Sequence, residues 1–541
     1  MTPIARRRAL VLVPLAGLAT AALLQIPSVA ALPSVPTYQT YAVGHNSGEP
    51  SIGYDTHADA AMFTAGTTTV RMRWNAQNKL IEASNVSDPD AKTSLDPIGF
   101  TDQRTHRSFT SQLTAACSLL SYSDDAGKTW TPSTGCGPAT FLDHQTVGGG
   151  PYTKEGRPAT AGLTGYPDAV YYCAQNGYSG TCARSDDGGL TFPFSSPAYN
   201  APTVHSDDAY GGACSAIHGH LRVDSDGIVY LPNKGCGGTP TPNNLTNSEF
   251  FGGEPAVIVS EDNGTTWNVR KVPGGHNQDE SDPSVAFDKA NTTYFGWEDG
   301  TNPTETQLGI KSAAKIAVSH DHGKTWSKPY DVSTALGVNN VQFPEVIAGD
   351  PGRAAFAFLG TRGIGDDQHI GFVGEWHVYV ATTLDGGASW TTVDVTPLDP
   401  VQRGCVDLQG TSNKNVADAR LCNQRNLLDF NDITVDKQGR VLVAYTDGCT
   451  KACITDKTSG GKGGVSMVAR QVSGPSLYAH ETLSAPVTTP GRPTTRGTGP
   501  TPTTSTPGGA LAATGGAPLV AVLALLVLGC AAAVRRARSR S

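Results

Sequence analysis

Positive charge is scarce between the two ends of this 541-residue chain. The formal net charge is −8, and seven of the arginines lie in residues 6–8 and 535–540. Without these terminal segments the net charge is −15, and such a surface repels phosphate backbones and anionic lipids. The sequence therefore argues against nucleic acid and anionic membrane surfaces as partners.

The eleven cysteines lack the CxxC spacing of a zinc ribbon. Cys530 stands alone in an apolar run, whereas the other ten fall into close pairs. Bonds between neighbours are the simplest disulfide scheme for an exported protein. The sequence thus predicts the disulfides Cys117–Cys136, Cys173–Cys182, Cys214–Cys236, Cys405–Cys422 and Cys449–Cys453.

Both ends of the chain carry targeting features. Residues 1–30 combine a basic start, an apolar stretch and small residues before a cleavage point, as a secretion signal does. Residues 483–510 are rich in Pro, Thr and Gly, which predicts an extended linker that spans the cell wall. The apolar run 517–534 predicts a transmembrane helix, and 535–541 a basic cytoplasmic tail.

One eight-residue pattern recurs five times in register. It reads Ser/Thr-x-Asp-x-Gly-x-Thr/Ser-aromatic and suits a tight β-hairpin, because Asp accepts backbone N–H bonds inside the turn and Gly tolerates positive φ. The copies occupy residues 123–130, 185–192, 260–267, 319–326 and 383–390.

These copies resemble the Asp-box (BNR) repeat of the sialidase superfamily of β-propellers, over residues 37–482. The resemblance implies an all-β propeller of four-stranded blades. It also implies that the Asp-boxes lie on the outer rim, between the third and fourth strands and far from the active centre. We therefore expect their Asp residues to stabilise turns, not to catalyse.

The segment Leu511-Ala512-Ala513-Thr514-Gly515, followed by the apolar run and the basic tail, resembles the sorting signal of Gram-positive surface proteins in its actinobacterial form. The resemblance implies that a sortase cleaves between Thr514 and Gly515 and joins Thr514 to peptidoglycan. A plain membrane anchor is the alternative. In either case we expect the propeller to lie outside the cell.

A second repeat, which reads strand, turn, strand, predicts the inner half of each blade. Its copies start at Glu49, Asp96, Arg157, His220, Asp282, Phe343 and Asp432. Most spacings fit one four-stranded blade. Seven blades is the preferred interpretation, and six is the alternative because the familiar sialidase propeller has six. We expect outer strands of the first blade at 69–74 and 79–83, and a decayed Asp-box of the last blade near 469–474.

The loops before the inner strands should converge on the central axis, and they are rich in His and carboxylate side chains. Chance clustering and capping of strands are the alternatives to a functional site. The candidate catalytic residues are Glu49, Asp282, Glu345, Asp432 and Tyr445. The candidate substrate-binding residues are Arg157, Arg425, His144, His218, His220 and His276, with Arg222 and Arg362 as further arginines.

The sequence departs from the sialidase pattern at one point. The family's first arginine stands in a Phe/Tyr-Arg-Ile-Pro motif, whereas this chain reads Gly48-Glu49-Pro50-Ser51-Ile52. A glutamate at the channel would repel sialic acid, so a neutral sugar handled by two carboxyl groups fits better.

The prediction is a surface-anchored monomer that hydrolyses extracellular carbohydrate as a sialidase-like exo-glycosidase and requires no cofactor. Two alternatives remain. One is a non-catalytic propeller that binds glycan or protein, since a fold does not settle function. The other is a metal-dependent polysaccharide lyase. Its divalent cation would be held in the central channel by His and acidic side chains of different blades, where such an ion could also serve only as a structural plug.

Overall fold

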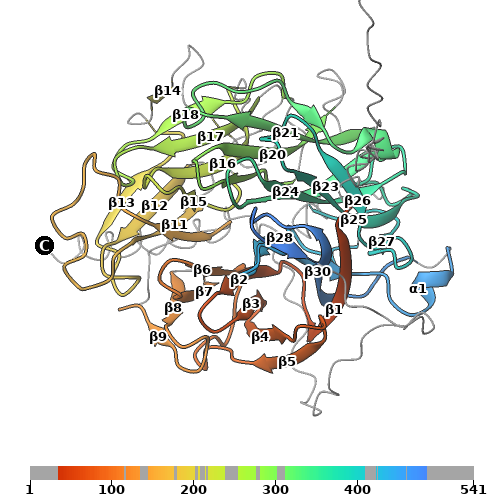
Figure 1. Cartoon of the computed structure of the whole chain (residues 1–541), viewed down its shortest axis with the longest axis horizontal. Helices are drawn as coiled ribbons and strands as arrows, with labels where there is room; N and C mark the ends of the chain where they lie inside the picture. The colour runs from red at the N-terminus through yellow and green to blue at the C-terminus, as the bar shows by residue number, and fades with distance from the viewer. Residues whose placement is uncertain are drawn as a thin grey trace, which may run out of the picture.

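The computed structural model describes residues 35–114, 117–134, 144–175, 179–201, 205–206, 214, 217–237, 254–275, 281–300, 311–408, 422, 424–457 and 460–483. These residues form seven antiparallel sheets arranged around one axis (Figure 1). The protein is a seven-bladed β-propeller, which confirms the preferred blade number.

Blades 1 to 3 each run outward from the axis in chain order. Blade 1 contains β2 (Ser51–Asp55), β3 (Ala60–Ala65), β4 (Thr68–Trp74) and β5 (Leu80–Asn85). Blade 2 contains β6 (Pro97–Thr101), β7 (Ser108–Leu113), β8 (Ser118–Ser123) and β9 (Thr131–Pro132). Blade 3 contains β10 (Thr146–Gly150), β11 (Ala169–Gln175), β12 (Gly180–Ser185) and β13 (Phe194–Pro197).

Blades 4 to 6 repeat this order, and blades 4 and 6 each gain a short extra strand. Blade 4 contains β15 (Arg222–Val223), β16 (Val229–Cys236), β17 (Glu254–Ser260), β18 (Asn268–Lys271) and the added β14 (His205–Ser206). Blade 5 contains β19 (Ser284–Phe287), β20 (Thr293–Gly300), β21 (Ser312–Ser319) and β22 (Tyr330–Asp331). Blade 6 contains β23 (Asn340–Ala348), β24 (Ala354–Thr361), β25 (Glu375–Thr383), β26 (Thr391–Asp394) and the added β27 (Gln402–Arg403).

Blade 7 closes the ring with strands from both ends of the propeller. It contains β28 (Asp432–Val435), β29 (Val441–Asp447), β30 (Val465–Pro475), the outer strand β1 (Thr37–Asn46) and the short β31 (Thr482–Leu483). Figure 1 shows β1, in red, beside β30, in blue. Because the fourth strand comes from the N-terminus, no hairpin joins the third and fourth strands of this blade. The expected Asp-box near 469–474 is therefore wrong, since those residues lie within β30.

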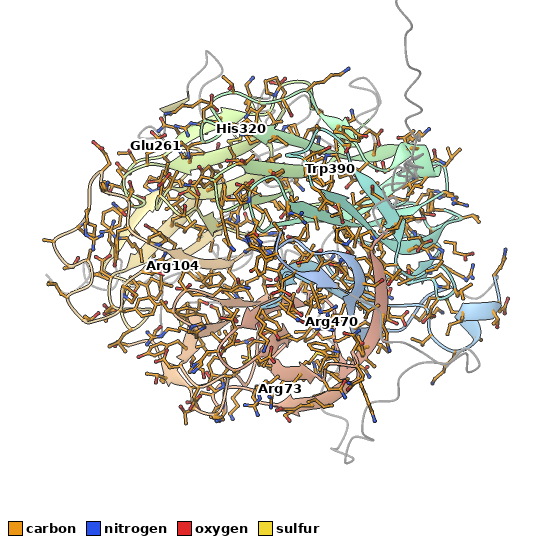
Figure 2. All side chains as sticks on the ribbon, viewed as in Figure 1. Arg73, Arg104, Glu261, His320, Trp390 and Arg470 are labelled. Atoms are coloured by element: carbon orange, nitrogen blue, oxygen red, sulfur yellow. A yellow bond between two sulfur atoms is a disulfide. The ribbon has the colours of Figure 1, made fainter. Side chains whose placement is uncertain are left out.

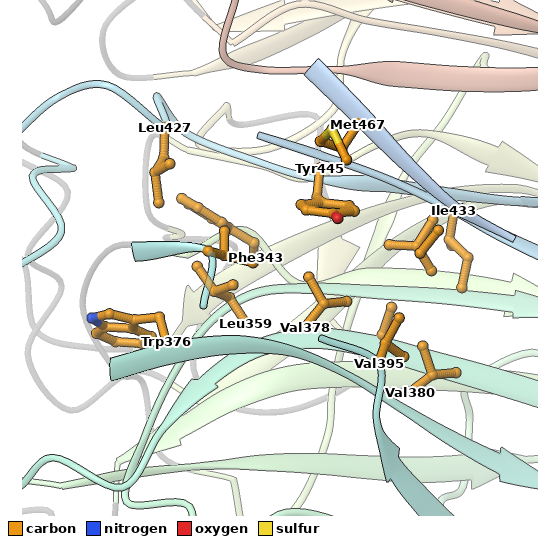
Figure 3. Packing of buried hydrophobic residues seen from close by; sticks show 14 of the residues in the cluster. Phe343, Leu359, Trp376, Val378, Val380, Val395, Leu427, Ile433, Tyr445 and Met467 are labelled. Carbon is orange, nitrogen blue, oxygen red and sulfur yellow. The ribbon is translucent and has the colours of Figure 1, made fainter. Parts of the chain in front are cut away.

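Apolar side chains fill the spaces between neighbouring blades. The cluster between blades 6 and 7 contains Phe343, Trp376, Tyr445 and Met467 (Figure 3). Burial of each large side chain contributes roughly 1.5–3 kcal/mol. Side chains occupy the whole disc, and Glu261 and His320 of two Asp-box turns lie toward its edge (Figure 2). Each blade is thus held by the two beside it.

The inner strand of blade 3 is displaced from its predicted position. The sequence predicts a start at Arg157, whereas the strand is β10 (Thr146–Gly150). Its glycines give no apolar signal, but they let blade 4 approach closely. A Cβ at Gly148 would lie 2.5 Å from a methyl carbon of Leu221. The outer strands predicted for blade 1 are confirmed as β4 and β5.

The five Asp-box turns join the third and fourth strands of blades 2 to 6. In each turn the Asp carboxylate accepts bonds from the N–H and the hydroxyl of the Thr or Ser four residues later. The pairs are Asp125–Thr129, Asp187–Thr191, Asp262–Thr266, Asp321–Thr325 and Asp385–Ser389. These carboxylates act within the turns, as expected.

Four of the predicted disulfides are present. They are Cys173–Cys182, Cys214–Cys236, Cys405–Cys422 and Cys449–Cys453. Cys117 is also disulfide-bonded, while Cys136 lies outside the described residues.

Helix is limited to α1 (Ala452–Thr455) and the 3-10 turn η1 (Thr334–Leu336) within the described ranges. None of the described helices has the length and apolarity to cross a membrane. The predicted signal 1–30, sorting motif 511–515, helix 517–534 and tail 535–541 lie outside the described residues, as does the linker after Leu483.

Candidate functional site at the axis

The two ends of the propeller carry different turns and loops. Strands alternate in direction within a blade, so the turns between strands 1 and 2 lie at the same end as the Asp-boxes. The inner strands begin at the opposite end, which we call the axial end. The loops that enter the seven inner strands therefore meet there, as expected.

Seven residues occupy equivalent positions at the axial end of the inner strands. We call them the second axial ring: Ser51, Pro97, Thr146, His220, Ser284, Glu345 and Asp432. Five of them begin their strands, whereas His220 lies two residues before β15 and Glu345 lies within β23. Several of them cap the next blade. Thr146 Oγ1 accepts a bond from the Leu221 N–H at 2.9 Å, and Ser284 Oγ accepts one from the Val346 N–H at 3.0 Å.

Asp432 links the last blade to the first. Its Oδ2 accepts a hydrogen bond from the Ile52 N–H at 2.8 Å, and its Oδ1 accepts one from the Ile433 N–H at 2.8 Å. Nη2 of Arg222 lies 3.3 Å from the same Oδ1. Capping of a strand, one of the alternatives, is therefore part of what Asp432 does.

His220, Glu345 and Asp432 meet across the axis although they come from blades 4, 6 and 7. One potential ligand atom from each lies within 4.8 Å of the other two. His220 Nδ1 lies 3.6 Å from Glu345 Oε1 and 4.0 Å from Asp432 Oδ1. The residues are 6%, 2% and 4% exposed, respectively. An imidazole with two carboxyl groups is a set that a divalent cation can use.

Burial controls the protonation of these three groups. It raises the pKa of Glu345 well above its usual range, and the Asp432 charge adds to the shift. It raises the pKa of Asp432 to about 6, although Arg222 acts in the opposite direction. Burial lowers the pKa of His220 far below its usual value, and the Arg222 charge adds to that. His220 is therefore neutral at pH 7.

Two residues before each member of the second ring stands a member of what we call the first axial ring. Its seven residues are Glu49, Leu95, His144, His218, Asp282, Phe343 and Phe430. Glu49, His144 and Phe343 have φ values of 50°, 52° and 56°. Left-handed backbone at non-glycine residues is strained, and it clusters at functional sites.

Glu49 forms a carboxyl pair with Asp429. Burial raises the pKa of Glu49 well above its usual range, and the charges of Asp429 and Asp96 add to the shift. Burial would also raise the pKa of Asp429, but the two-pronged ion pair with Arg425 outweighs it and lowers that pKa. Oε2 of Glu49 receives no hydrogen bond from a described residue. Glu49 therefore carries a proton beside an ionised Asp429.

His144 interacts with acidic side chains of two other blades. Its Nδ1 is 3.2 Å from Oδ2 of Asp282, and its charge acts on Asp429. Its ring meets that of His218 edge-on, at 6.4 Å between centroids. Oδ1 of Asp282 accepts no hydrogen bond among the described residues. The acidic and histidine side chains of the two rings thus interact electrostatically.

The structure does not bring all the predicted residues to the axial end. Arg157 is exposed in the β10–β11 connection, where its guanidinium lies 4.9 Å from the Tyr152 ring centre. That connection contacts the Asp-box turn of blade 4, because Asn263 Nδ2 donates to Glu155 O. Tyr445 packs in the cluster between blades 6 and 7 (Figure 3). Arg157 therefore lies apart from the axial residues, and Tyr445 lies in a packing cluster.

Four further candidates remain. Arg222 and Arg425 are engaged by Asp432 and Asp429, respectively. Arg362 is exposed in the β24–β25 connection. His276 lies outside the described residues. Asp429 belongs to the carboxylate-rich loops that the sequence predicts at the axis, but it is not among the candidate catalytic residues.

Comparison with known proteins agrees with this fold. The BNR/Asp-box repeat family matches residues 121–132 and 317–328. The chain is a seven-bladed propeller with Asp-box repeats. Curated protein sequences give no significant match.

Similar solved structures include an arabinofuranosidase, a sialidase and a lectin. An α-L-arabinofuranosidase from Fusarium graminearum is 12% identical, with a TM-score of 0.38 over 70% of this chain and 92% of that one. A Hadza microbial sialidase is 12% identical, with a TM-score of 0.34 over 80% and 68%. A lectin from Aleuria aurantia is 8% identical, with a TM-score of 0.36 over 65% and 96%. At these values no activity or ligand carries over to this chain.

Proposed function

We propose that this protein is a secreted glycoside hydrolase, anchored at the cell surface, that cleaves extracellular glycans at the axial end of its propeller. The observation that carries the proposal is the pair formed by Glu49 and Asp429. Two adjacent carboxyl groups whose pKa values are pushed apart are the arrangement that acid–base catalysis needs.

Glu49 is the proton donor in this scheme. Its raised pKa keeps it protonated at neutral pH, whereas Arg425 keeps its neighbour Asp429 ionised. During cleavage the Glu49 proton passes to the glycosidic oxygen, the bond between that oxygen and the anomeric carbon breaks, and the leaving group departs as an alcohol.

Asp282 is the general base. One of its oxygens faces His144 Nδ1, and the other accepts no hydrogen bond from the described residues. It takes a proton from the water that attacks the anomeric carbon, so the products are a hemiacetal and an alcohol. Proton exchange through the neighbouring His144 restores both carboxyl groups.

The charges around the site favour a neutral substrate over sialic acid. Glu49, Asp282 and Asp429 surround the proposed reaction centre, and the nearby Arg425 is already paired. No described arginine at the axial end is therefore free to bind a substrate carboxylate. The same proposal includes export of the protein, its attachment through Thr514 and a monomeric state. It also includes activity without a required cofactor.

A non-catalytic binding propeller is the second candidate, because the axial carboxyl groups are deeply buried. Glu49 and Asp282 are only 2% and 6% exposed. A site that binds a sugar ring must expose its catalytic carboxyl groups more than these two are exposed. The acidic network would then serve to hold the blades together.

Hydrolysis by the purified full-length protein decides between the two. The substrates are a panel of neutral aryl glycosides, polysaccharides and 4-methylumbelliferyl sialic acid. We expect release from a neutral substrate, and loss of that release in Glu49→Gln. The matched control is Glu155→Gln, an exposed glutamate at the opposite end. Absence of release from every substrate by folded protein would refute the hydrolase and favour the binding propeller.

A further inference from the structure

We propose that His220, Glu345 and Asp432 bind one divalent transition-metal ion at the axis. This goes beyond the hydrolase proposed above, whose proton donor and base are Glu49 and Asp282. The two proposals use different residues and can fail independently.

The spacing of the three ligand atoms fits a metal ion. Because no two of them are more than 4.8 Å apart, a point exists within about 2.8 Å of all three, and small side-chain shifts bring it to the ~2.0–2.2 Å of bonds to Zn²⁺. The gap of 3.6 Å between His220 Nδ1 and Glu345 Oε1 is too long for a hydrogen bond. It is close to the separation of two ligands on one ion.

His220 supplies the nitrogen ligand of this set. Its side chain is more than nine-tenths buried, and the facing oxygens of Glu345 and Asp432 lie 3.6 and 4.0 Å from Nδ1, beyond the length of a hydrogen bond. Phe430 packs edge-on against the ring at 4.7 Å. A neutral imidazole is the form that binds metals.

Supporting bonds hold the two carboxyl groups in place. Ser284 Oγ donates to Glu345 Oε2 at 2.9 Å, which leaves Oε1 toward His220. The Ile52 and Ile433 amides hold Asp432. Such bonds orient ligands and raise metal affinity. Glu345 lies in β23, Asp432 begins β28 and His220 lies two residues before β15, so three blades position the ligands before the ion arrives.

The donor set points to the class of ion. One nitrogen and two carboxylates favour Zn²⁺ or Mn²⁺ over Ca²⁺, which prefers oxygen alone. Two negative charges balance a divalent cation. The Arg222 guanidinium competes with the ion for Asp432, since Nη2 lies 3.3 Å from Asp432 Oδ1. Without metal, a proton on Glu345 satisfies the same charges, and this is the alternative that the test must exclude.

The test measures metal content and affinity in the full-length protein. After chelation and dialysis, Zn²⁺, Mn²⁺ or Ca²⁺ is titrated by calorimetry, and bound metal is counted by mass spectrometry. We expect one Zn²⁺ or Mn²⁺ per chain, a higher thermal midpoint with the ion, and much weaker Ca²⁺ binding. Glu345→Gln and His220→Gln should each weaken binding by at least about 100-fold.

His320→Gln, at an exposed Asp-box histidine, is the matched control and should bind like the unaltered chain. If the ligand variants do not fold, Ser284→Ala removes only the supporting bond and should weaken binding about 10-fold. Absence of bound metal in the unaltered protein would overturn the proposal. Equal binding by folded Glu345→Gln would overturn it too, because the ion would then lie elsewhere.

Discussion

Glu49 and Asp429 are adjacent carboxyl groups with opposite pKa shifts, because Arg425 stabilises only the charge of Asp429 directly. Glu49 comes from the loop before β2 and Asp429 from the loop before β28. They therefore join the first and last blades at the axis, and the chemistry depends on closure of the ring.

Removal of the Asp429 charge should shift the pH dependence of the hydrolytic activity. In Asp429→Asn the repulsion that raises the pKa of Glu49 disappears, while the Arg425 charge remains. The activity needs protonated Glu49, so its alkaline limb should shift to lower pH by about one unit or more. The measurement is kcat/KM from pH 4 to 9. Asp90→Asn, at an exposed position, should leave the limb in place, and an unmoved limb in Asp429→Asn would exclude Glu49 as the acid.

Asp168 should make stability depend on pH. It is fully buried, its Oδ2 accepts a bond from Arg104 Nε at 3.0 Å, and burial raises its pKa to about 6. The folded state therefore binds this proton more tightly than the unfolded state does. This contribution is fully present below pH 4 and is lost as pH rises through 6.

Comparison with Asp168→Asn isolates that contribution. The free energy of unfolding of the unaltered protein, minus that of the variant, should fall by about 2 kcal/mol between pH 4 and 7. Chemical denaturation at several pH values measures it. A difference that stays constant, or rises, would contradict the assigned pKa.

Tyr41 should anchor the closing strand β1. It is 3% exposed, its ring meets that of Trp74 edge-on at 5.6 Å, and its hydroxyl donates to Asn78 O. Tyr41→Ala should lower the free energy of unfolding by about 3–5 kcal/mol. Tyr330→Ala, on the exposed strand β22, should cost less than about 1 kcal/mol. Equal effects would mean that β1 does not hold the ring closed.

The blade number was predictable because its signal is local. Each Asp-box and each inner strand pair is contained within about sixty residues, and their patterns repeat. Reasoning from local patterns failed where a strand pairs with another strand that is far away in the sequence. Tyr41 pairs with Val468, and nothing near residue 468 indicates that its neighbour lies at the other end of the propeller.

The position of the axial site was predictable from the sequence, but the contacts between its side chains were not. Residues before the inner strands do converge, and Glu49, His144 and Asp282 are among them. That His220 meets Glu345 and Asp432 depends on strand register in three blades, which the sequence does not specify. Arg157 was misplaced because β10 consists largely of glycine and lacks the apolar pattern of a strand.

The most direct test of the account compares leaving groups in Glu49→Gln. A proton donor matters most when the leaving group is a poor one. With an alkyl glycoside we expect kcat to fall about 10²–10⁴-fold. With a 2,4-dinitrophenyl glycoside of the same sugar, which needs no proton, we expect little loss. Equal losses on both substrates would contradict the claim that Glu49 donates the proton at the axial end.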